Sequence, residues 1–168
     1  MPEKLERSRE DALRIARAAD YAVLSYIDAA TGAPHGVPVS PVVTPEGVVF
    51  WHCTNGPSTR NAGVEADPRV SLTFVARCED LAQKYSNNYA SAVLKGRARR
   101  IDDPDEKREA ALLICVRHAG GVERMKRHAA YYEVDNAGMC VWRLDPEEVT
   151  GRARRWDLAV KEFEARGF

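Results

Sequence analysis

The connections between the first strand-like segments constrain the fold of this chain most strongly. Residues 21–27 and 36–44 are rich in β-branched and aromatic side chains, and only a short turn containing glycine and proline separates them. A second turn, at 45–47, leads directly into a third run of bulky residues at 48–53. Since a parallel crossover needs about a dozen residues or more, these connections predict antiparallel strands rather than a βαβ fold.

Strands and helices follow one another along the rest of the chain. Further strands are expected at 70–75, 89–101, 139–144 and 149–152. Helices are expected at about 3–19, at 59–65, within an insertion of about 103–131 that includes a short helix at 122–130, and at 156–163. Residues 78–88 are polar and are expected to be irregular, whereas Gly96 indicates a bulge or a close backbone approach. The pattern predicts one domain over residues 1–168: a mainly β, antiparallel, Greek-key-like barrel with flanking helices.

Charge and cysteine content argue against several classes of function. The 25 basic and 25 acidic residues cancel, so the chain lacks the long-range attraction that nucleic acid or anionic lipid needs. The N-terminus has no apolar run typical of a signal peptide, and no segment approaches the length of a membrane span. The four cysteines are widely spaced and form neither CxxC pairs nor a zinc pattern. We therefore expect a soluble cytoplasmic protein with reduced thiols and no metal site, which binds neither nucleic acid nor membrane.

The segment 50–60 carries the clearest chemical signal. A strand end is followed by four polar side chains at the start of a helix: Thr54, Ser58, Thr59 and Arg60. Hydroxyls, free backbone N–H groups and a guanidinium are the groups that bind a phosphate monoester. These residues alone leave a second interpretation open, in which Ser58 or Thr59 only caps the helix and Arg60 lies in solvent.

The order and spacing of several motifs resemble the pyridoxamine-phosphate-oxidase superfamily. Segments 51–55, 58–60 and 66–70 resemble its FMN-binding signature. Within the superfamily the chain is most similar to NimA-type nitroimidazole-resistance proteins, through the motifs Gly36–Ser40, Phe50–His52, Asn88–Ser91 with Gly96, and Thr150–Arg154. Thr59 departs from the pattern, because many relatives carry a basic residue there. The resemblance covers about residues 20–155 and implies an FMN-binding split β-barrel.

The resemblance also implies where the cofactor lies. FMN is expected between the subunits of a homodimer, in an apolar slot with a few fixed polar groups. Its isoalloxazine ring is expected against Val37, Pro38, Val39 and Ser40, with the wall continued by His52, Cys53 and Thr54. Its phosphate is expected at Ser58, Thr59 and Arg60, and Ser91 and Trp142 complete the cofactor-binding set. The candidates for contact across the dimer are Trp142, Trp156, Arg152 and Arg154, with core tryptophans and solvated arginines as the alternative.

His52 is the predicted catalytic residue. It lies at a strand end beside the expected flavin, where an imidazole that titrates near neutrality can donate a proton to a small-molecule substrate or orient it. A satisfied histidine at the barrel rim is the alternative, and His35, His118 and His128 are expected to be structural.

The resemblance implies an FMN-dependent oxidoreductase that reduces nitroimidazoles or other small electrophiles with electrons from a nicotinamide. Oxidation of pyridoxamine phosphate itself is not expected, because the C-terminal arginine and histidine pattern of that enzyme is missing. Two alternatives stay open. One is a haem-binding protein with His52, His118 or His128 as the axial ligand, and the other is a flavin carrier or sensor without turnover.

Overall fold

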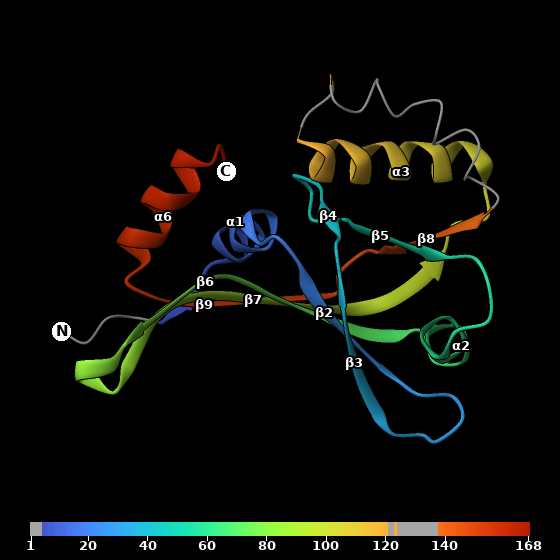
Figure 1. The fold of residues 1–168 in the computed structure, drawn as a ribbon, viewed down its shortest axis with the longest axis horizontal. Helices are drawn as coiled ribbons and strands as arrows, with labels where there is room; N and C mark the ends of the chain where they lie inside the picture. Colours follow the sequence, from blue (N-terminus) through green and yellow to red (C-terminus); the bar gives the residue numbers. More distant parts are fainter. Residues whose placement is uncertain (1–4, 121–122, 124–137) are drawn as a thin grey trace.

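Nine antiparallel strands form one sheet in the computed structural model, which describes residues 5–120, 123 and 138–168 (Figure 1). The strands are β1 (Glu6–Arg7), β2 (Ala22–Ile27), β3 (Pro34–Val39), β4 (Val42–Val43), β5 (Val49–Thr54), β6 (Arg69–Leu81), β7 (Ser86–Arg100), β8 (Met139–Leu144) and β9 (Glu148–Arg154). The helices are α1 (Arg9–Ala18), α2 (Thr59–Ala66), α3 (Pro104–Ala119) and α6 (Trp156–Ala165), with a 3₁₀ turn η1 at Ala82–Lys84. The predicted mainly β, antiparallel fold with flanking helices is confirmed.

β7 organises the sheet because it changes partner along its length. The strand order is β3-β2-β6-β7-β8-β5-β4, and β9 pairs with β7 and β1. β7 pairs with β9 over residues 89–95 and with β8 over residues 98–100. Gly96 lies at this change of partner, where a Cβ atom would come within 3.0 Å of Leu144 Cδ1 and 3.1 Å of the Asp145 carbonyl oxygen. Gly96 therefore marks a close backbone approach, one of the two alternatives that the sequence left open.

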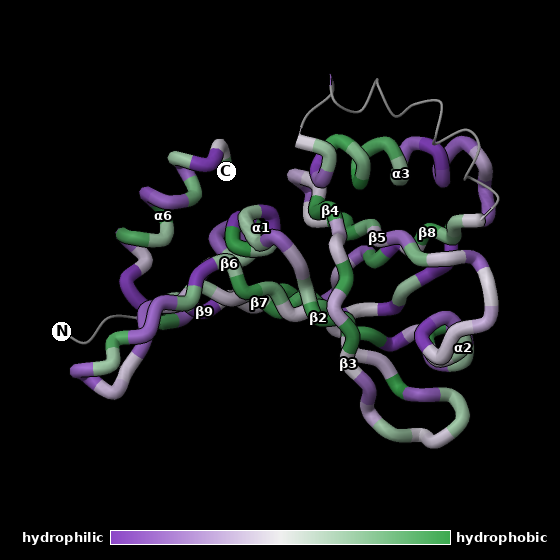
Figure 2. The backbone as a smooth tube through the Cα atoms, in the orientation of Figure 1, coloured by the Kyte–Doolittle hydropathy of each residue, from purple (hydrophilic) through white to green (hydrophobic). Residues whose placement is uncertain are grey.

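Two apolar clusters cover the two sides of the sheet. Inward-facing residues of the strands pack with α1 and α6 into the main core, which includes Ile15, Leu72, Trp51 and Phe163. α3 covers the other side of β5 and β8 (Figure 1), where Ile114 belongs to a second cluster. Figure 2 shows that the hydrophobic stretch of α3 lies in its C-terminal half. None of the helices in the described part of the chain is long and apolar enough to span a membrane.

Three segments differ from the sequence prediction. The extended run expected at 36–44 is divided into β3 and β4, which pair with different strands. The N-terminal helix begins at Arg9 instead of residue 3, because Ser8 caps it by accepting a hydrogen bond from the Asp11 N–H at 3.1 Å, and residues 6–7 pair with β9. The prediction of irregular structure at 78–88 is wrong. Here β6 and β7 continue as a hairpin, since polar cross-strand bonds replace apolar alternation: Asn88 Nδ2 donates to Glu79 Oε2 at 3.0 Å.

The remaining helices lie close to their predicted positions. α2 and α6 match the predicted helices at 59–65 and 156–163. Within the predicted insertion at 103–131, α3 ends where Gly120 adopts a left-handed conformation with φ of 77°. The short helix predicted at 122–130 falls, apart from residue 123, outside the described residues.

Candidate functional site

The candidate site is built around the end of β5 and the loop that leads into α2. Successive side chains of a strand point to opposite faces, so β5 directs Cys53 into the core, where it is 5% exposed, and turns His52 and Thr54 to the surface. The predicted flavin wall at 52–54 is therefore divided between two faces of one strand.

The same alternation divides the predicted wall on β3. Val37 and Val39 lie opposite Leu24 and Ala22 of β2 and point inward, and Val39 is buried. Pro38 is exposed on the outer face, and Ser40, just beyond the strand, is also exposed. An outer-face site can thus use the side chain of Pro38, together with backbone groups of this strand.

The N-terminus of α2 combines a capped helix with a half-buried guanidinium. Ser58 Oγ accepts a hydrogen bond from the Asn61 N–H at 3.1 Å, so Ser58 is the N-cap, as one sequence interpretation expected. Thr59 is exposed. Arg60 is half-buried rather than solvated, and its Nε atom is buried with no hydrogen-bond partner among the described residues. Such an unpaired donor beside a helix N-terminus favours an anion.

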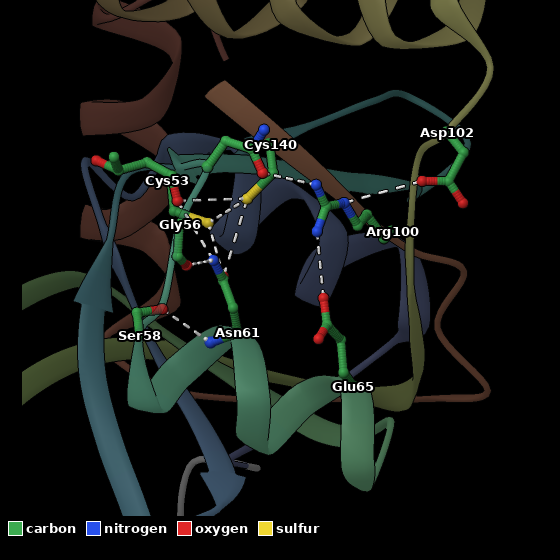
Figure 3. Close-up of polar contacts among 10 residues, drawn as sticks. Cys53, Gly56, Ser58, Asn61, Glu65, Arg100, Asp102 and Cys140 are labelled. Carbon is green, nitrogen blue, oxygen red and sulfur yellow. Dashed lines mark hydrogen bonds and ion pairs between the residues drawn. The ribbon is translucent and has the colours of Figure 1, made fainter. Parts of the chain in front are cut away.

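Two surface hollows flank the loop between β5 and α2. One, of about 430 Å³, is lined by Ser58 and Thr59 together with the turn after β2. The other, of about 370 Å³, is lined by Ser58, Glu65 and Arg100 among others. Arg100 lines the second hollow and donates to Asn55 Oδ1 at 2.7 Å. It also donates to Glu65 Oε1 at 3.2 Å (Figure 3). Both hollows therefore share the loop predicted to hold phosphate.

Asn61 is a residue of this site that the sequence analysis missed. It is 5% exposed, and its Nδ2 donates to the carbonyl oxygens of Thr54 and Gly56, both at 3.3 Å. Its Oδ1 accepts from the Cys53 thiol at 3.0 Å (Figure 3). Asn61 thus ties the loop to α2 and to the end of β5. A polar side chain at the third position of a helix whose other inward residues are small or apolar is the signal that could have identified it.

The environment of His52 disfavours its charged form. Partial burial lowers the pKa of His52, and the positive charges of His118 and Arg60 lower it further. The ring is therefore neutral at pH 7. His118, at the end of α3, was expected to be structural, and the structure brings it within electrostatic range of His52. His118 Nε2 lies 3.1 Å from the Pro41 carbonyl oxygen, and because a carbonyl only accepts, this nitrogen carries the proton.

The other predicted site residues lie elsewhere. Trp142 is 2% exposed and stacks against Trp51 in the main core, with ring centroids 6.3 Å apart, so the structure does not bring it to the face of His52. Ser91 is half-buried on β7, opposite Val75 and Arg152. His35 packs near Tyr26, with ring centroids 5.3 Å apart, and His128 lies outside the described residues.

The other candidates for cross-dimer contact lie on β9 and at the start of α6. Trp156 is half-buried and meets Phe163 edge to face. Arg154 Nη1 donates to Ser86 Oγ, and Arg152 is exposed on β9. These positions leave both arginines on the surface and most of Trp156 covered by its own chain.

Known proteins share this fold and this sequence pattern. One similar structure is a candidate 5-nitroimidazole antibiotic resistance protein from Bacteroides thetaiotaomicron, with 19% identity, TM-score 0.72, and coverage of 89% of this chain and 86% of that one. A conserved hypothetical protein from Mycobacterium tuberculosis has 15% identity and TM-score 0.71, and the match covers 90% of this chain and 88% of that one. An FAD and haem binding protein from Mycobacterium smegmatis has 16% identity and TM-score 0.70, and the match covers 91% of this chain and 74% of that one. These identities show the shared fold alone.

The sequence itself identifies the family. No curated protein matches the chain significantly. The profile of the pyridoxamine 5'-phosphate oxidase family, however, matches residues 8–153. This range is most of the chain, from the residue before α1 to the next-to-last residue of β9. The split-barrel relatives above and this match agree with the motifs in the sequence, and the chain therefore belongs to the pyridoxamine 5'-phosphate oxidase family.

Proposed function

We propose that this protein is an FMN-dependent oxidoreductase that works as a homodimer and reduces small electrophiles, with nitroimidazoles as the first class to test. The flavin in the M. smegmatis relative and the nitroimidazole resistance assigned to the B. thetaiotaomicron relative support this choice. When bound, FMN would supply the two-electron chemistry, and the chain would bind it, orient the substrate and move protons.

The unpaired Nε of Arg60 is the observation that carries the proposal. A buried guanidinium N–H without an acceptor costs about 1–3 kcal/mol, and a phosphate oxygen would remove that cost. The N-terminal N–H groups of α2 and the exposed hydroxyl of Thr59 would add further donors. Ser58 would act chiefly by holding the helix start in place, because its Oγ already caps α2.

His52 is the proposed catalytic residue. Its ring is accessible on the surface of β5 and within electrostatic range of Arg60. Because its pKa is lowered, the neutral imidazole dominates at pH 7 and can orient a substrate by donating one hydrogen bond and accepting another. Only its minor protonated form can deliver a proton, so a rate limited by proton delivery should increase as the pH falls.

An exposed apolar face supports the proposed homodimer. Three large side chains on the outer face of the sheet are open to solvent, Tyr21 at 53%, Val23 at 36% and Val75 at 44%. Pro38 lies directly opposite Val23 in the sheet, and Ser91 lies directly opposite Val75. These two predicted cofactor-binding residues therefore share a face with the apolar side chains that a second copy would cover.

Haem binding is the second candidate function. The M. smegmatis relative binds haem as well as FAD, and two histidines of this chain, His52 and His118, lie within electrostatic range of each other. In its neutral form His118 carries its proton on Nε2, so Nδ1 is then the nitrogen with a free lone pair. We prefer FMN because the N-terminus of α2 and the Arg60 guanidinium would together offer several donors to one phosphate group.

Titration of the purified protein with FMN, followed by flavin fluorescence and absorbance, tests the proposal. We expect saturable binding that Arg60→Gln weakens by about 10- to 100-fold, the range for one charge-assisted hydrogen bond. The matched control is Arg69→Gln, an exposed arginine paired with Asp67, which should leave the affinity unchanged. Equal affinity in the parent and in Arg60→Gln would contradict the phosphate assignment. A sharp Soret band on addition of haem, without flavin uptake, would favour the second candidate.

Turnover separates an enzyme from a flavin carrier. With NADH and a nitroimidazole, we expect the parent to turn over and His52→Ala to bind FMN normally but to lose rate. If the parent shows no turnover with nitroimidazoles or quinones while it binds FMN, the chain is a carrier or sensor. Sedimentation at micromolar concentration tests the homodimer, and a monomer that binds FMN tightly would exclude a site shared between subunits.

A further inference from the structure

Two buried cysteines face each other beneath the candidate site. Cys53 of β5 and Cys140 of β8 are directly opposite in the antiparallel ladder, and their sulfur atoms are 2.9 Å apart (Figure 3). They are 5% and 2% exposed. Opposite residues of antiparallel strands have Cα atoms about 4.5–5.5 Å apart, which lies inside the range of about 4.4–6.8 Å found for disulfides. A bond can therefore form by rotation of the side chains without a shift of either strand.

The surroundings of the pair favour a thiolate on Cys140. The hydrogen bond from Cys53 lowers the pKa of Cys140, burial raises it by less, and the positive charge of Arg100 lowers it further. The same pairing, together with burial, raises the pKa of Cys53. Cys140 is thus the nucleophile and Cys53 the partner that resolves the reaction, since the thiolate is the reactive form of cysteine. In the described part of the chain, no third metal-ligating side chain joins the two sulfurs in a group that could hold a metal ion.

We propose that Cys53 and Cys140 form a reversible disulfide, and that its formation loosens the loop between β5 and α2. With a peroxide as the oxidant, the Cys140 thiolate attacks one oxygen, the O–O bond breaks, and a sulfenic acid and hydroxide result. The Cys53 sulfur then attacks the Cys140 sulfur, the S–OH bond breaks, and the S–S bond forms. In sum two thiols and one hydrogen peroxide give one disulfide and two waters, and a dithiol reductant reverses the change.

Asn61 transmits the change to the loop. In the reduced form its Oδ1 lies 3.0 Å from the Cys53 sulfur and 3.9 Å from the Cys140 sulfur, and the S–H of Cys53, which stays protonated when Cys140 is ionised, can donate to it. A disulfide has no S–H group, so oxidation leaves this buried oxygen without that donor. The same amide group donates to the carbonyl oxygens of Thr54 and Gly56, so any movement that rehydrates Asn61 also releases the loop.

The consequence for the cofactor rests on the proposed function. If the loop holds the FMN phosphate, oxidation should weaken flavin binding, and reduction should restore it. The disulfide itself and the loosening of the loop can be measured in the absence of FMN, so failure of the FMN assignment would be distinguishable from failure of this inference.

The first experiment counts thiols in the full chain. Protein treated with hydrogen peroxide is unfolded in an alkylating reagent, and we expect two thiols to be protected, a mass lower by two hydrogens, and a peptide that links Cys53 to Cys140. Cys78→Ser is the matched control, because Cys78 is exposed and should leave the disulfide intact. Four alkylated thiols after oxidation, or a linkage through Cys78 or Cys115, would overturn the proposal.

The second experiment measures the loop. Amide hydrogen exchange at residues 54–61 should accelerate about tenfold on oxidation and return to its original rate with dithiothreitol. Cys140→Ala should show the same exchange rate before and after peroxide treatment. Unchanged exchange in a parent protein whose disulfide is confirmed by mass would refute the switch. FMN affinity is measured on the same two forms, and a disulfide that accelerates exchange but leaves tight FMN binding unchanged would place the phosphate elsewhere.

Discussion

Replacement of Gly63 by alanine should destabilise the protein although alanine is the better helix former. Gly63 lies in the middle of α2, where the helix packs on β2. A Cβ atom there would lie 2.5 Å from Tyr26 Cδ2 and 2.7 Å from the Ile27 carbonyl oxygen. Ordinary contacts between carbon atoms are about 3.5–4.0 Å, so the overlap is about 1 Å. The Tyr26 ring is buried and the Ile27 oxygen belongs to the backbone of β2, so α2 itself has to move.

The magnitude follows from two opposing effects. Overpacking costs about 1–3 kcal/mol, and replacing glycine by alanine in a helix returns about 1 kcal/mol. Because one of the contacts is with backbone, the cost lies at the upper end, and we expect the free energy of unfolding to fall by about 1–2 kcal/mol. FMN binding should weaken as well, since the N-terminus of α2 moves with the helix.

Urea unfolding followed by tryptophan fluorescence measures this change. Gly56→Ala is the matched control, because nothing lies within 4 Å of the added Cβ, and its stability should stay within about 0.5 kcal/mol of the parent. If Gly63→Ala were as stable as the parent or more stable, the Tyr26 ring would have to give way. The close packing of α2 on β2 would then not determine the position of the loop.

Two further changes test the electrostatics and the core. Arg60→Gln should raise the pKa of His52, which NMR titration of its ring protons measures. The value should stay below about 6.5 because burial is the larger cause of the shift. An unchanged value, which is the result expected for the control Arg69→Gln, would contradict the electrostatic effect of Arg60 on His52. Since the folded pKa is the lower one, the contribution of His52 to stability is complete above about pH 6.5 and is lost as the pH falls toward the folded pKa. Trp51→Ala should cost about 3–5 kcal/mol in urea unfolding because the side chain is fully buried. Trp51→Phe should cost less than about 2 kcal/mol because it also removes an indole N–H that has no partner among the described residues; equal costs for both would refute this, and Tyr85→Ala, fully exposed, is the control.

The fold was predictable where local pattern and tertiary structure agree. The β-branched and aromatic runs at 21–27 and 48–53 form β2 and β5, and a short turn joins each to an antiparallel neighbour. The hairpin at 78–88 was not predictable in this way, because its strands are held by pairs such as Glu79 and Asn88, whose polar side chains are typical of a loop. Hydrophobic periodicity reports burial, and a hairpin that extends beyond the core has little of it.

The candidate site was likewise predictable from the sequence only in part. Ser58, Thr59 and Arg60 are neighbours in sequence, so a strand end followed by a helix cap was enough to bring them together. Cys53 and Cys140 are 87 positions apart, and only the register between β5 and β8 makes them partners. The spacing of cysteines in the sequence indicated isolated thiols, because spacing records proximity along the chain and says nothing of strands that meet through a sheet.

The loop between β5 and α2 is held from three directions, and this decides which residues can alter the site. Asn61 holds it from α2, Arg100 holds Asn55 from the end of β7, and the Asn55 N–H donates to the Gly138 carbonyl oxygen, just before β8, at 2.7 Å. Each contact comes from a different element, so loss of one leaves the loop tethered but shifted. Changes at Asn61 or Arg100 should therefore act on cofactor affinity through the position of the loop. Changes at Thr59 or Arg60 remove donors from the proposed phosphate site directly, and the two classes differ in whether hydrogen exchange of the loop changes with the affinity.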